Sequence, residues 1–343
     1  MLDKFFKKES PILGMLGMGG GIARGSSGLG PLEITGASVT SYSDSTHTWI
    51  VQTASNPITT NRGFDSADEV EILLVGGGGG GGYGLSGAAS GGGGAGGVVV
   101  VPKTKGPEII TAPGTYPISV GGGGSYATGP DDPSQSGGNT QIASVAIPLL
   151  ARGGGRGGQN FDNPGQPGGS GGGGAANSNG GPGTQPTENP GVSGINQYGN
   201  PGRRGNAPTE PYQAGGGGGA GQGGPITSVV RGGADGIAIS PLLPGFMTPS
   251  FPTPIINALG AIPNSSPEYD YFGGGAGGGA RGGGLSPFGL GGGGQGGGVP
   301  PASPGTAGKN GRGGGGGGGA ENGGQADGAA GGSGCFIIRF KQL

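Results

Sequence analysis

The residues Glu69-Val70-Glu71-Ile72-Leu73-Leu74-Val75 run directly into seven consecutive glycines, Gly76–Gly82. The last glycine block is followed by a similar stretch, Cys335-Phe336-Ile337-Ile338-Arg339-Phe340. Both flanking stretches are rich in β-branched and apolar residues, which predicts strands. The glycine blocks between them are then either a flexible linker or a packed bundle of glycine helices held by a small β frame. The functional interpretation depends on which of the two is right.

Glycine supplies 100 of the 343 residues, hydrophobic residues make up 30% and charged residues 10%, and the formal net charge is −2. So few apolar residues can form only one or two small cores, which argues against an ordinary multidomain enzyme. So little charge argues equally against a solvated, disordered polyelectrolyte. His47 and Cys335 are the only histidine and cysteine. We therefore expect no enzyme, no cofactor, no metal site and no intrachain disulfide.

Nucleic-acid and membrane partners are also not expected. The near-neutral chain lacks the basic patch that nucleic acids require, and no stretch approaches the roughly 18 apolar residues of a membrane span. A loose G-x-G-x-x-G match within 76–82 has no helix after it to bind a phosphate. Five arginines lie beside glycines without the interleaved aromatic residues that stack on bases. We expect them to cap or solubilise the glycine blocks: Arg152, Arg156, Arg231, Arg281 and Arg312.

Residues 1–30 are interpreted as an N-terminal anchoring peptide and linker. Met1 to Lys8 is basic, and Pro11 to Ala23 is mostly small and apolar, which superficially resembles a secretion signal. Acidic residues interrupt the basic part and glycines dilute the apolar part, so we favour a peptide that docks into a larger partner over a cleaved signal. The candidate anchor residues are Phe5, Phe6, Ile12, Leu13 and Leu16.

Residues 31–150 are expected to form a β-rich frame that contains the first glycine runs, with Asn56–Asp68 as a loop. The C-terminal strand 334–343 should return to this frame. The predicted fold class is therefore all-β, a small antiparallel β-sandwich with essentially no α-helix outside the N-terminal segment. Segments rich in Thr, Val, Ile and aromatic residues predict the strands: Ile34–Thr40, Thr46–Gln52, Val70–Val75, Gly97–Pro102, Glu108–Thr111, Thr115–Val120 and Thr140–Ala146.

Residues 151–333 are predicted to form a glycine-rich bundle with extruded loops. Ordering the backbone of one residue costs about 1–2 kcal/mol, and glycine loses the most, so an isolated glycine run would stay disordered. Several runs side by side as polyproline-II-type helices, with about three residues per turn, can pair their backbones closely because no Cβ intervenes. The many runs of similar length favour such a polyglycine-II-like bundle, and their irregular glycine spacing excludes collagen.

The segment 236–272 is nearly free of glycine and brings Leu, Met, Phe and Tyr together, while its prolines forbid a long helix. We predict that it forms, with the loop region 159–212, the contact surface for a host or partner. Glu268 and Asp270 between aromatic residues would suit a sugar; alternatively, the aromatic residues only pack against the bundle edge. The candidate contact residues are Phe246, Phe251, Tyr269, Tyr271 and Phe272.

Several segments resemble the glycine-rich, tail-fibre-like virion proteins of tailed bacteriophages, especially those of marine and cyanobacterial phages. The resemblance rests on Val70–Val75 leading into glycine, on Thr111–Gly121, on Gly137-Gly138-Asn139-Thr140 and on Gly332–Phe340, and it covers residues 32–341 in order. The segment 236–272 departs from the family pattern because it is longer and more apolar. The resemblance implies a structural protein on the surface of the phage particle and carries over no functional residue.

We therefore expect a fibre or fibre-like adhesin that displays host-contact loops on the bundle. Its expected partners are other virion proteins, bound through the N-terminal segment, and a host-surface receptor or glycan. An oligomer is also expected, as is common for phage fibres. One alternative is a capsid or tail decoration protein without receptor binding. Another is a secreted glycine-rich matrix protein with disordered glycine runs.

Overall fold

A computed structural model describes residues 30–36, 39–84, 88–129, 132–187, 189, 193–206, 212–223, 230–282, 284–299, 303–320 and 326–342. The chain divides into two compact units, Met1–Pro31 and Leu32–Leu343. The predicted anchor residues Phe5, Phe6, Ile12, Leu13 and Leu16 lie outside the described residues. The frame, the glycine runs and the returning C-terminal strand all belong to the second unit, which is described below.

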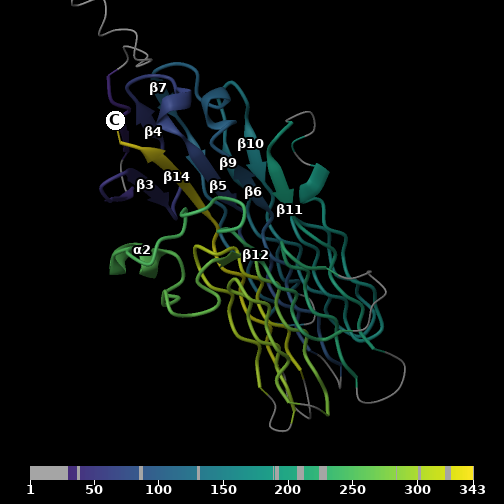
Figure 1. The fold of residues 1–343 in the computed structure, drawn as a ribbon. Coiled ribbons are helices and arrows are strands. Elements are labelled where there is room, and N and C mark those ends of the chain that lie inside the picture. The colour runs from purple at the N-terminus through teal and green to yellow at the C-terminus, as the bar shows by residue number, and fades with distance from the viewer. Residues whose placement is uncertain are drawn as a thin grey trace, which may run out of the picture. The chain divides into compact units, whose positions relative to one another are not determined.

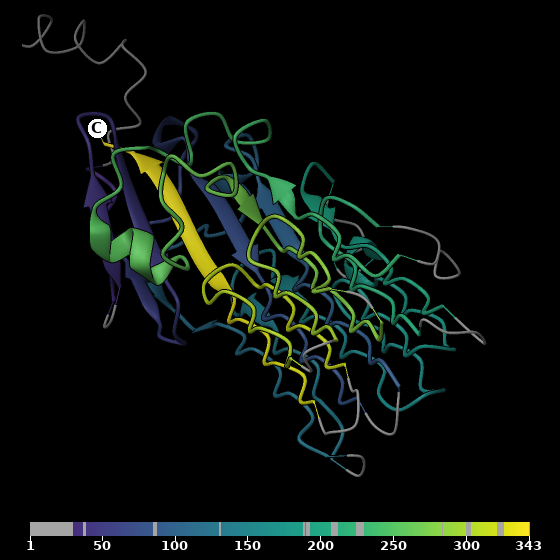
Figure 2. The same cartoon turned by 90° about the horizontal axis from the view of Figure 1, so that it is seen from below.

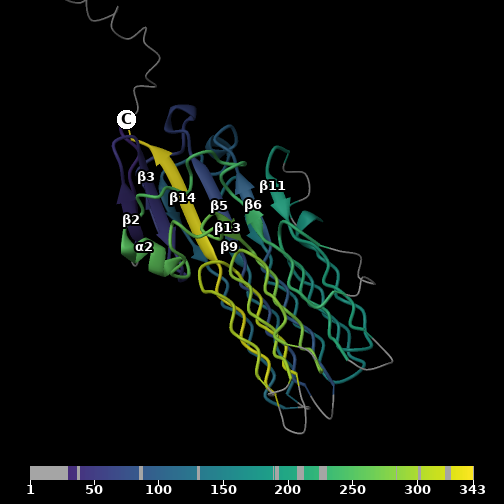
Figure 3. The ribbon, with the colours of Figure 1, turned by 60° about the horizontal axis from the view of Figure 1, so that its bottom comes forward.

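A six-stranded antiparallel sheet forms the centre of this unit (Figures 1 and 3). The C-terminal strand β14 lies inside the sheet, with Ile337 opposite Leu73 on one side and Val51 on the other. The C-terminal strand thus pairs with two strands of the frame. In spatial order the strands are β11 (Asn196–Tyr198), β6 (Val98–Val101), β5 (Glu71–Val75), β14 (Cys335–Lys341), β3 (His47–Gln52) and β2 (Thr40–Ser43).

Three smaller antiparallel sheets accompany it. They are β1 (Ile34–Gly36), β4 (Ile58–Thr60) and β7 (Gly114–Tyr116); β10 (Leu149–Ala151), β9 (Thr140–Ile142) and β8 (Ile118–Ser119); and β12 (Ile237–Ala238) with β13 (Tyr271–Phe272). In the described residues the helices are short: α2 (Thr253–Ala258) and the 3-10 turns η1 (Ser66–Asp68), η2 (Gly106–Glu108) and η3 (Gln185–Thr187). The fold is thus mostly β, with several small antiparallel sheets and almost no α-helix among the described residues.

Both faces of the large sheet are covered by other parts of the protein. Successive strand residues point to opposite faces, so each strand contributes to two separate clusters. In β5, Ile72 and Leu74 join a cluster shared with the two three-stranded sheets, while Leu73 and Val75 join a second cluster on the other face. The segment 236–272 covers that second face, and α2 lies beside β2 and β3 (Figure 2). The described apolar side chains thus form two clusters, one on each face of the large sheet, in line with the one or two small cores that the composition predicts.

Two local predictions were wrong. Glu108–Thr111 is not a strand: the chain there leaves the 3-10 turn η2, whose Pro107 lacks an N–H for a sheet ladder. Ile109 and Ile110 are nevertheless fully buried in the first cluster. The expected loop Asn56–Asp68 contains β4, which pairs with both β1 and β7. A three-residue strand is too short to show the alternation by which strands are recognised.

The first glycine run leaves β5 and donates hydrogen bonds to three different neighbouring segments in turn. Gly76, Gly79 and Gly82 donate to residues of 91–97, at N···O distances of 2.9, 2.9 and 3.0 Å. The next positions in the sequence, 77 and 80, donate to residues of 135–138, and positions 78, 81 and 84 donate to residues of 326–332. The direction of donation therefore repeats every third residue.

The carbonyl groups of the same run accept with the same period. Carbonyls 77 and 80 accept from residues 154 and 157, carbonyls 78 and 81 from residues 124 and 127, and carbonyls 79 and 82 from residues 316 and 319. Three donor directions and three acceptor directions give the run six neighbouring segments. Such segments lie side by side beyond the sheet in Figures 1 and 3. Backbone partners thus satisfy all seven N–H groups and most carbonyl groups of the run, and the Ser90 hydroxyl also donates to the Gly82 carbonyl at 2.6 Å.

Segments at the edge of these glycine runs show the same period in their burial. In Gly199-Asn200-Pro201-Gly202-Arg203-Arg204-Gly205 the three glycines are buried, whereas the residues between them are partly exposed. Residues 121, 124 and 127 are likewise buried, with exposed residues between them. Burial at every third position is therefore typical of these edge segments, whereas every residue of the central run 76–82 is buried. The exposed Gly123 is nevertheless close to a neighbouring backbone, since a Cβ there would lie 1.9 Å from the Gly331 carbonyl oxygen.

Candidate functional site

The predicted contact residues of the segment 236–272 are mostly inside the protein. The exposed fractions are 0% for Phe246 and Phe272, 4% for Phe251 and 7% for Tyr269, and Tyr271 is half-buried. The first four belong to the cluster that covers the large sheet. Because a buried side chain offers a partner no surface, their positions give no support to direct contact. They hold the segment on the sheet.

Trp49 of β3 is the centre of this packing. Its indole Nε1 donates to the carbonyl oxygen of Phe246 at 2.8 Å. The ring of Phe251 meets the indole edge-on, with centroids 5.6 Å apart, and Tyr42 lies 5.5 Å away on a tilted plane. Such aromatic contacts add to the stabilisation from burial alone. They fix residues 244–251 against the end of β3.

Arg312 joins the glycine region to the same segment. Its guanidinium is buried, with Nε donating to the Leu259 carbonyl at 2.7 Å and Nη1 to the carbonyls of Tyr269 and Tyr271 at 2.7 and 2.9 Å. It also lies over the ring of Phe272, 4.3 Å from the centroid. Burial lowers the pKa of Arg312 to about 10, so it stays charged at neutral pH. The side chain of Arg312 therefore caps carbonyls of the segment 236–272 and not, as expected, those of a glycine block.

The carboxylates predicted for a sugar site are engaged elsewhere. Asp270 accepts the backbone N–H of Ser240 with both oxygens, each at 2.9 Å. Glu268 is nearly buried beside Lys309, and the Tyr269 hydroxyl donates to a backbone carbonyl, that of Thr248, at 2.6 Å. Burial raises the pKa of Tyr269 to about 12. These groups therefore position the segment and do not form an open sugar platform.

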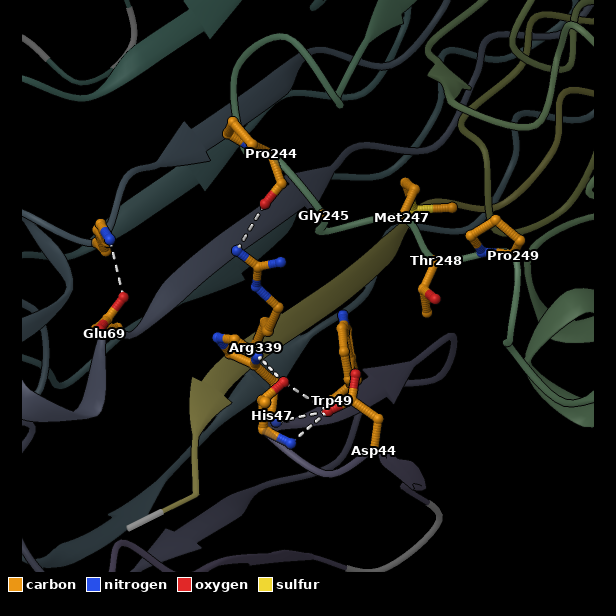
Figure 4. A pocket seen from close by; sticks show the side chains of 12 residues that line it. Asp44, His47, Trp49, Glu69, Pro244, Gly245, Met247, Thr248, Pro249 and Arg339 are labelled. Atoms are coloured by element: carbon orange, nitrogen blue, oxygen red, sulfur yellow. Dashed lines mark hydrogen bonds and ion pairs between the residues drawn. The ribbon is translucent and has the colours of Figure 1, made fainter.

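An open depression of about 460 Å³ lies where residues 244–249 meet the ends of β3 and β14 (Figure 4). One wall is the segment itself, with Pro244, Gly245, Met247, Thr248 and Pro249. The other wall is the end of the large sheet, with His47, Trp49 and Arg339, and the remaining lining residues are Asp44, Thr46, Glu69 and Lys103. The glycine runs adjoin β14 and β5 at the opposite end of the sheet, where Cys335 pairs with Val75.

Arg339 is the most constrained charge in this depression. It forms a buried ion pair with Glu71, its Nη2 donates to the Pro244 carbonyl at 3.1 Å, and its guanidinium lies 5.6 Å from the ring centroid of Phe246 and 6.0 Å from that of Trp49. Its Nε is buried and has no hydrogen-bond partner among the described residues. Burial raises the pKa of Glu71, and the attraction of Arg339 opposes that rise.

His47 lies on the sheet side of the depression. Its Nδ1 is 2.8 Å from the Thr46 hydroxyl, and Asp44 accepts the backbone N–H groups of Thr46 and His47 at 2.7 and 2.8 Å. Burial and the charge of Arg339 lower the pKa of His47, so the ring is neutral at pH 7. Although burial alone would raise the pKa of Asp44, these hydrogen bonds lower it, so it remains an anion.

The rim carries an ion-pair chain around Glu69. Its carboxylate lies 2.8 Å from the Lys103 ammonium and 3.4 Å from that of Lys341. Hydrogen bonds from these two lysines lower the pKa of Glu69. The depression thus combines fixed donors, fixed acceptors and apolar side chains, an arrangement suited to binding a polar ligand.

Sequence reasoning missed this depression. One signal was available, because Arg339 is a single arginine within the apolar stretch 335–340, and a charge in a buried strand needs partners. The pairing of that strand with β3, and hence the meeting of Arg339 with His47, was not readable from spacing. Among the described residues, no group of three or more His, Cys, Asp or Glu side chains is placed to hold a metal ion. No described helix has the length and hydropathy to cross a membrane.

A comparison with known protein families matches residues 53–341 to a glycine-rich domain. A comparison with curated proteins finds no match. The match covers most of the chain, from the loop after β3 to the returning strand β14, and leaves β1, β2 and β3 outside it. The glycine runs and the strands from β4 to β14 therefore lie within the matched glycine-rich domain.

Proposed function

The chain belongs to the glycine-rich domain family, and from that premise we propose that it is a non-enzymatic structural protein built on a polyglycine-II-like bundle. The observation that carries this proposal is the three-residue repeat of hydrogen-bond direction along 76–84, with six neighbouring segments. A polyproline-II-type helix has about three residues per turn and no internal hydrogen bonds, so its backbone groups are free to bind neighbours.

Two further observations support the same geometry. No glycine within 76–82 has a positive φ, as expected if these residues share one left-handed helical conformation with φ near about −75°. A Cβ built on Gly79, at the centre of the run, would lie 2.2 Å from the carbonyl oxygen of Gly155. Backbones that approach so closely leave room for glycine alone.

We propose further that the protein is a component of a phage particle, a fibre or fibre-like adhesin whose loops contact the host surface. The resemblance described above supports the virion role, and a rigid bundle would suit the display of loops. In this proposal the N-terminal segment binds other virion proteins, the loops bind a host receptor or glycan, and the protein is an oligomer on the particle surface. A decoration protein without receptor binding is the nearest alternative.

Hydrogen exchange of the purified protein tests the bundle. The amides of 76–82, 91–97 and 315–319 should exchange slowly, because each pairs with a neighbouring carbonyl. Exchange of these amides at the rate of an unstructured peptide would exclude the bundle and favour a disordered matrix protein. Tryptophan fluorescence in the same sample reports whether the frame is intact, so a misfolded preparation can be recognised.

Immunogold electron microscopy of intact particles tests the biological role, with an antibody raised against the folded protein. Label at the distal ends of tails or fibres is the result expected for an adhesin. Label spread over the capsid would replace the adhesin with a decoration protein. Particles that carry no label, while the purified protein is recognised on the same grid, would refute the virion assignment.

A further inference from the structure

We propose that the depression between residues 244–249 and the ends of β3 and β14 binds a neutral saccharide unit. This inference goes beyond the proposed function, because it concerns the frame and requires neither the bundle nor a phage particle. The volume of about 460 Å³ lies within the range of about 300–1,000 Å³ that is typical of small-ligand sites. The argument rests on the hydrogen-bonding groups, the charge balance and the apolar wall.

Arg339 supplies donors that the protein does not use. A guanidinium has five N–H donors, and the described interactions of this one, with Glu71 and the Pro244 carbonyl, involve Nη2. Nε has no hydrogen-bond partner among the described residues. Buried donors without a partner are uncommon and call for an explanation. One explanation is that a bound ligand supplies the acceptor, which Nε would reach after a small shift of the guanidinium.

Gly245 leaves space beside another nitrogen of this guanidinium. Its φ is +73°, and a Cβ built there would lie 3.2 Å from Nη1 of Arg339. Any larger residue would be strained by the backbone and would press on the guanidinium. Gly245 is itself part of the wall of the depression, so the absence of its side chain opens the way from the depression to Arg339.

The charges that line the depression balance. Lys103 and Arg339 carry two positive charges, Asp44 and Glu69 carry two negative charges, and His47 is neutral at pH 7. A ligand with a net charge would meet attraction and repulsion of similar size. A neutral ligand whose groups both donate and accept hydrogen bonds can use the carboxylates as well as the cations. Sugar hydroxyl groups have this property.

The opposite wall is mostly apolar. Pro244, Met247 and Pro249 contribute to it beside Gly245 and Thr248, without any charged group, and Figure 4 shows this segment on one side with His47 and Arg339 on the other. A sugar ring combines a C–H face with a rim of hydroxyl groups, so it can pack on this wall while its hydroxyls reach the sheet side. An inorganic ion would leave the apolar wall unused.

Trp49 provides the test, because it is the only tryptophan of the chain and it lines the depression. The purified full-length protein is titrated with D-glucose, D-galactose, D-mannose and N-acetyl-D-glucosamine while Trp49 emission is recorded, and ligand-observed NMR repeats each titration. We expect a saturable response to at least one sugar. His47→Ala and Lys103→Ala should each weaken its binding by about tenfold, while the exposed Thr59→Ala variant leaves it unchanged.

Sodium acetate and sodium phosphate are titrated in parallel, and thermal melts establish that each variant is folded. A response to the anions alone would overturn the proposal in favour of an anion site. Failure of all four sugars to give a saturable signal in either method would overturn it as well. So would sugar binding of equal affinity in His47→Ala, Lys103→Ala and the unmodified protein, because the ligand would then lie elsewhere.

Discussion

Replacing Gly124 by alanine tests how closely the glycine segments pack. Gly124 is a buried position of the segment 121–127. A Cβ at this position would lie 2.0 Å from the carbonyl oxygen of Gln135, 2.8 Å from its carbonyl carbon and 2.9 Å from the nitrogen of Gly80. Relief of that contact requires the segments 121–127 and 135–138 to separate by about 1 Å, which is enough to break the hydrogen bonds between them.

The size of the effect follows from those hydrogen bonds. Gln135 donates to the Ser125 carbonyl and Gly138 to the Gly122 carbonyl, both at 2.8 Å, and Gly124 itself donates to the first glycine run at 2.8 Å. Each backbone hydrogen bond contributes about 0.5–1.5 kcal/mol net. The loss of two or three should lower the free energy of unfolding of Gly124→Ala by about 2–4 kcal/mol.

Gly122→Ala is the matched control, because Gly122 is in the same segment and a Cβ there would have nothing within 4 Å. It should leave stability unchanged or raise it by about 0.4–1 kcal/mol through a less flexible unfolded chain. Urea denaturation followed by Trp49 fluorescence, with hydrogen exchange of the segment, measures both variants. If the two alanine variants differ by less than about 0.5 kcal/mol, the close-packing argument is refuted.

Three other predictions concern single side chains. Arg312→Met should lower the free energy of unfolding by about 3–5 kcal/mol, because three carbonyls lose their donor; Arg204→Met, in a partly exposed edge position, should change it by less than about 0.5 kcal/mol, and equal effects in urea denaturation would contradict the buried clamp. Because the pKa of His47 is lowered in the folded protein, the unfolded chain binds a proton more readily. As the pH is lowered, the free energy of unfolding should therefore begin to fall near the ordinary histidine pKa and level off below the lowered pKa. Urea titrations between about pH 7 and pH 5 should show a smaller fall for His47→Gln, and parallel curves would contradict this. Burial raises the pKa of Cys335 to about 12, so its thiol should react with a disulfide reagent at mildly alkaline pH only in urea; rapid reaction of the folded protein would count against its buried position.

The main strands were predictable because they are long enough to show their pattern. Val70–Val75 and 335–340 are apolar runs beside glycine, and their return to one sheet follows from the need to bury both. The shortest strands, such as β4, β10 and β11, were not predictable in this way. Three residues carry no periodicity, and their pairing depends on tertiary contacts rather than on propensity.

The glycine spacing contained more information than its irregularity suggested. The segment 199–205 has glycine at every third position and is an edge, whereas 76–82 is all glycine and has six neighbours. Glycine at every third position is thus sufficient in the edge segment 199–205, while the central run 76–82 has glycine throughout. The edge segment 121–127, which begins with four glycines, shows that consecutive glycines alone do not identify a central run. Whether a run is central or at an edge depends on how many segments surround it, and this number cannot be predicted from the local sequence.

For the candidate contact residues, the sequence could not distinguish a binding surface from a core. A cluster of Phe, Tyr, Leu and Met in a glycine-rich chain suits a binding surface and a core equally well, since both are apolar. The structure shows that these residues belong to a core, because the segment 236–272 covers the second face of the large sheet. The depression beside Arg339 could not be foreseen because its walls come from sequence positions about 200 residues apart.

The frame explains how the glycine runs become ordered at all. Each ordered glycine loses more than the usual 1–2 kcal/mol or so of backbone entropy, while its hydrogen bond returns about 0.5–1.5 kcal/mol, so the runs do not stabilise themselves. Val75 is opposite both Val98 and Cys335 in the sheet, and the next residue, Gly76, continues the pairing by donating to Gly97 at 2.9 Å. The register of β5 with its two neighbouring strands therefore continues into the first glycine runs, so the packing of the sheet fixes how these runs align.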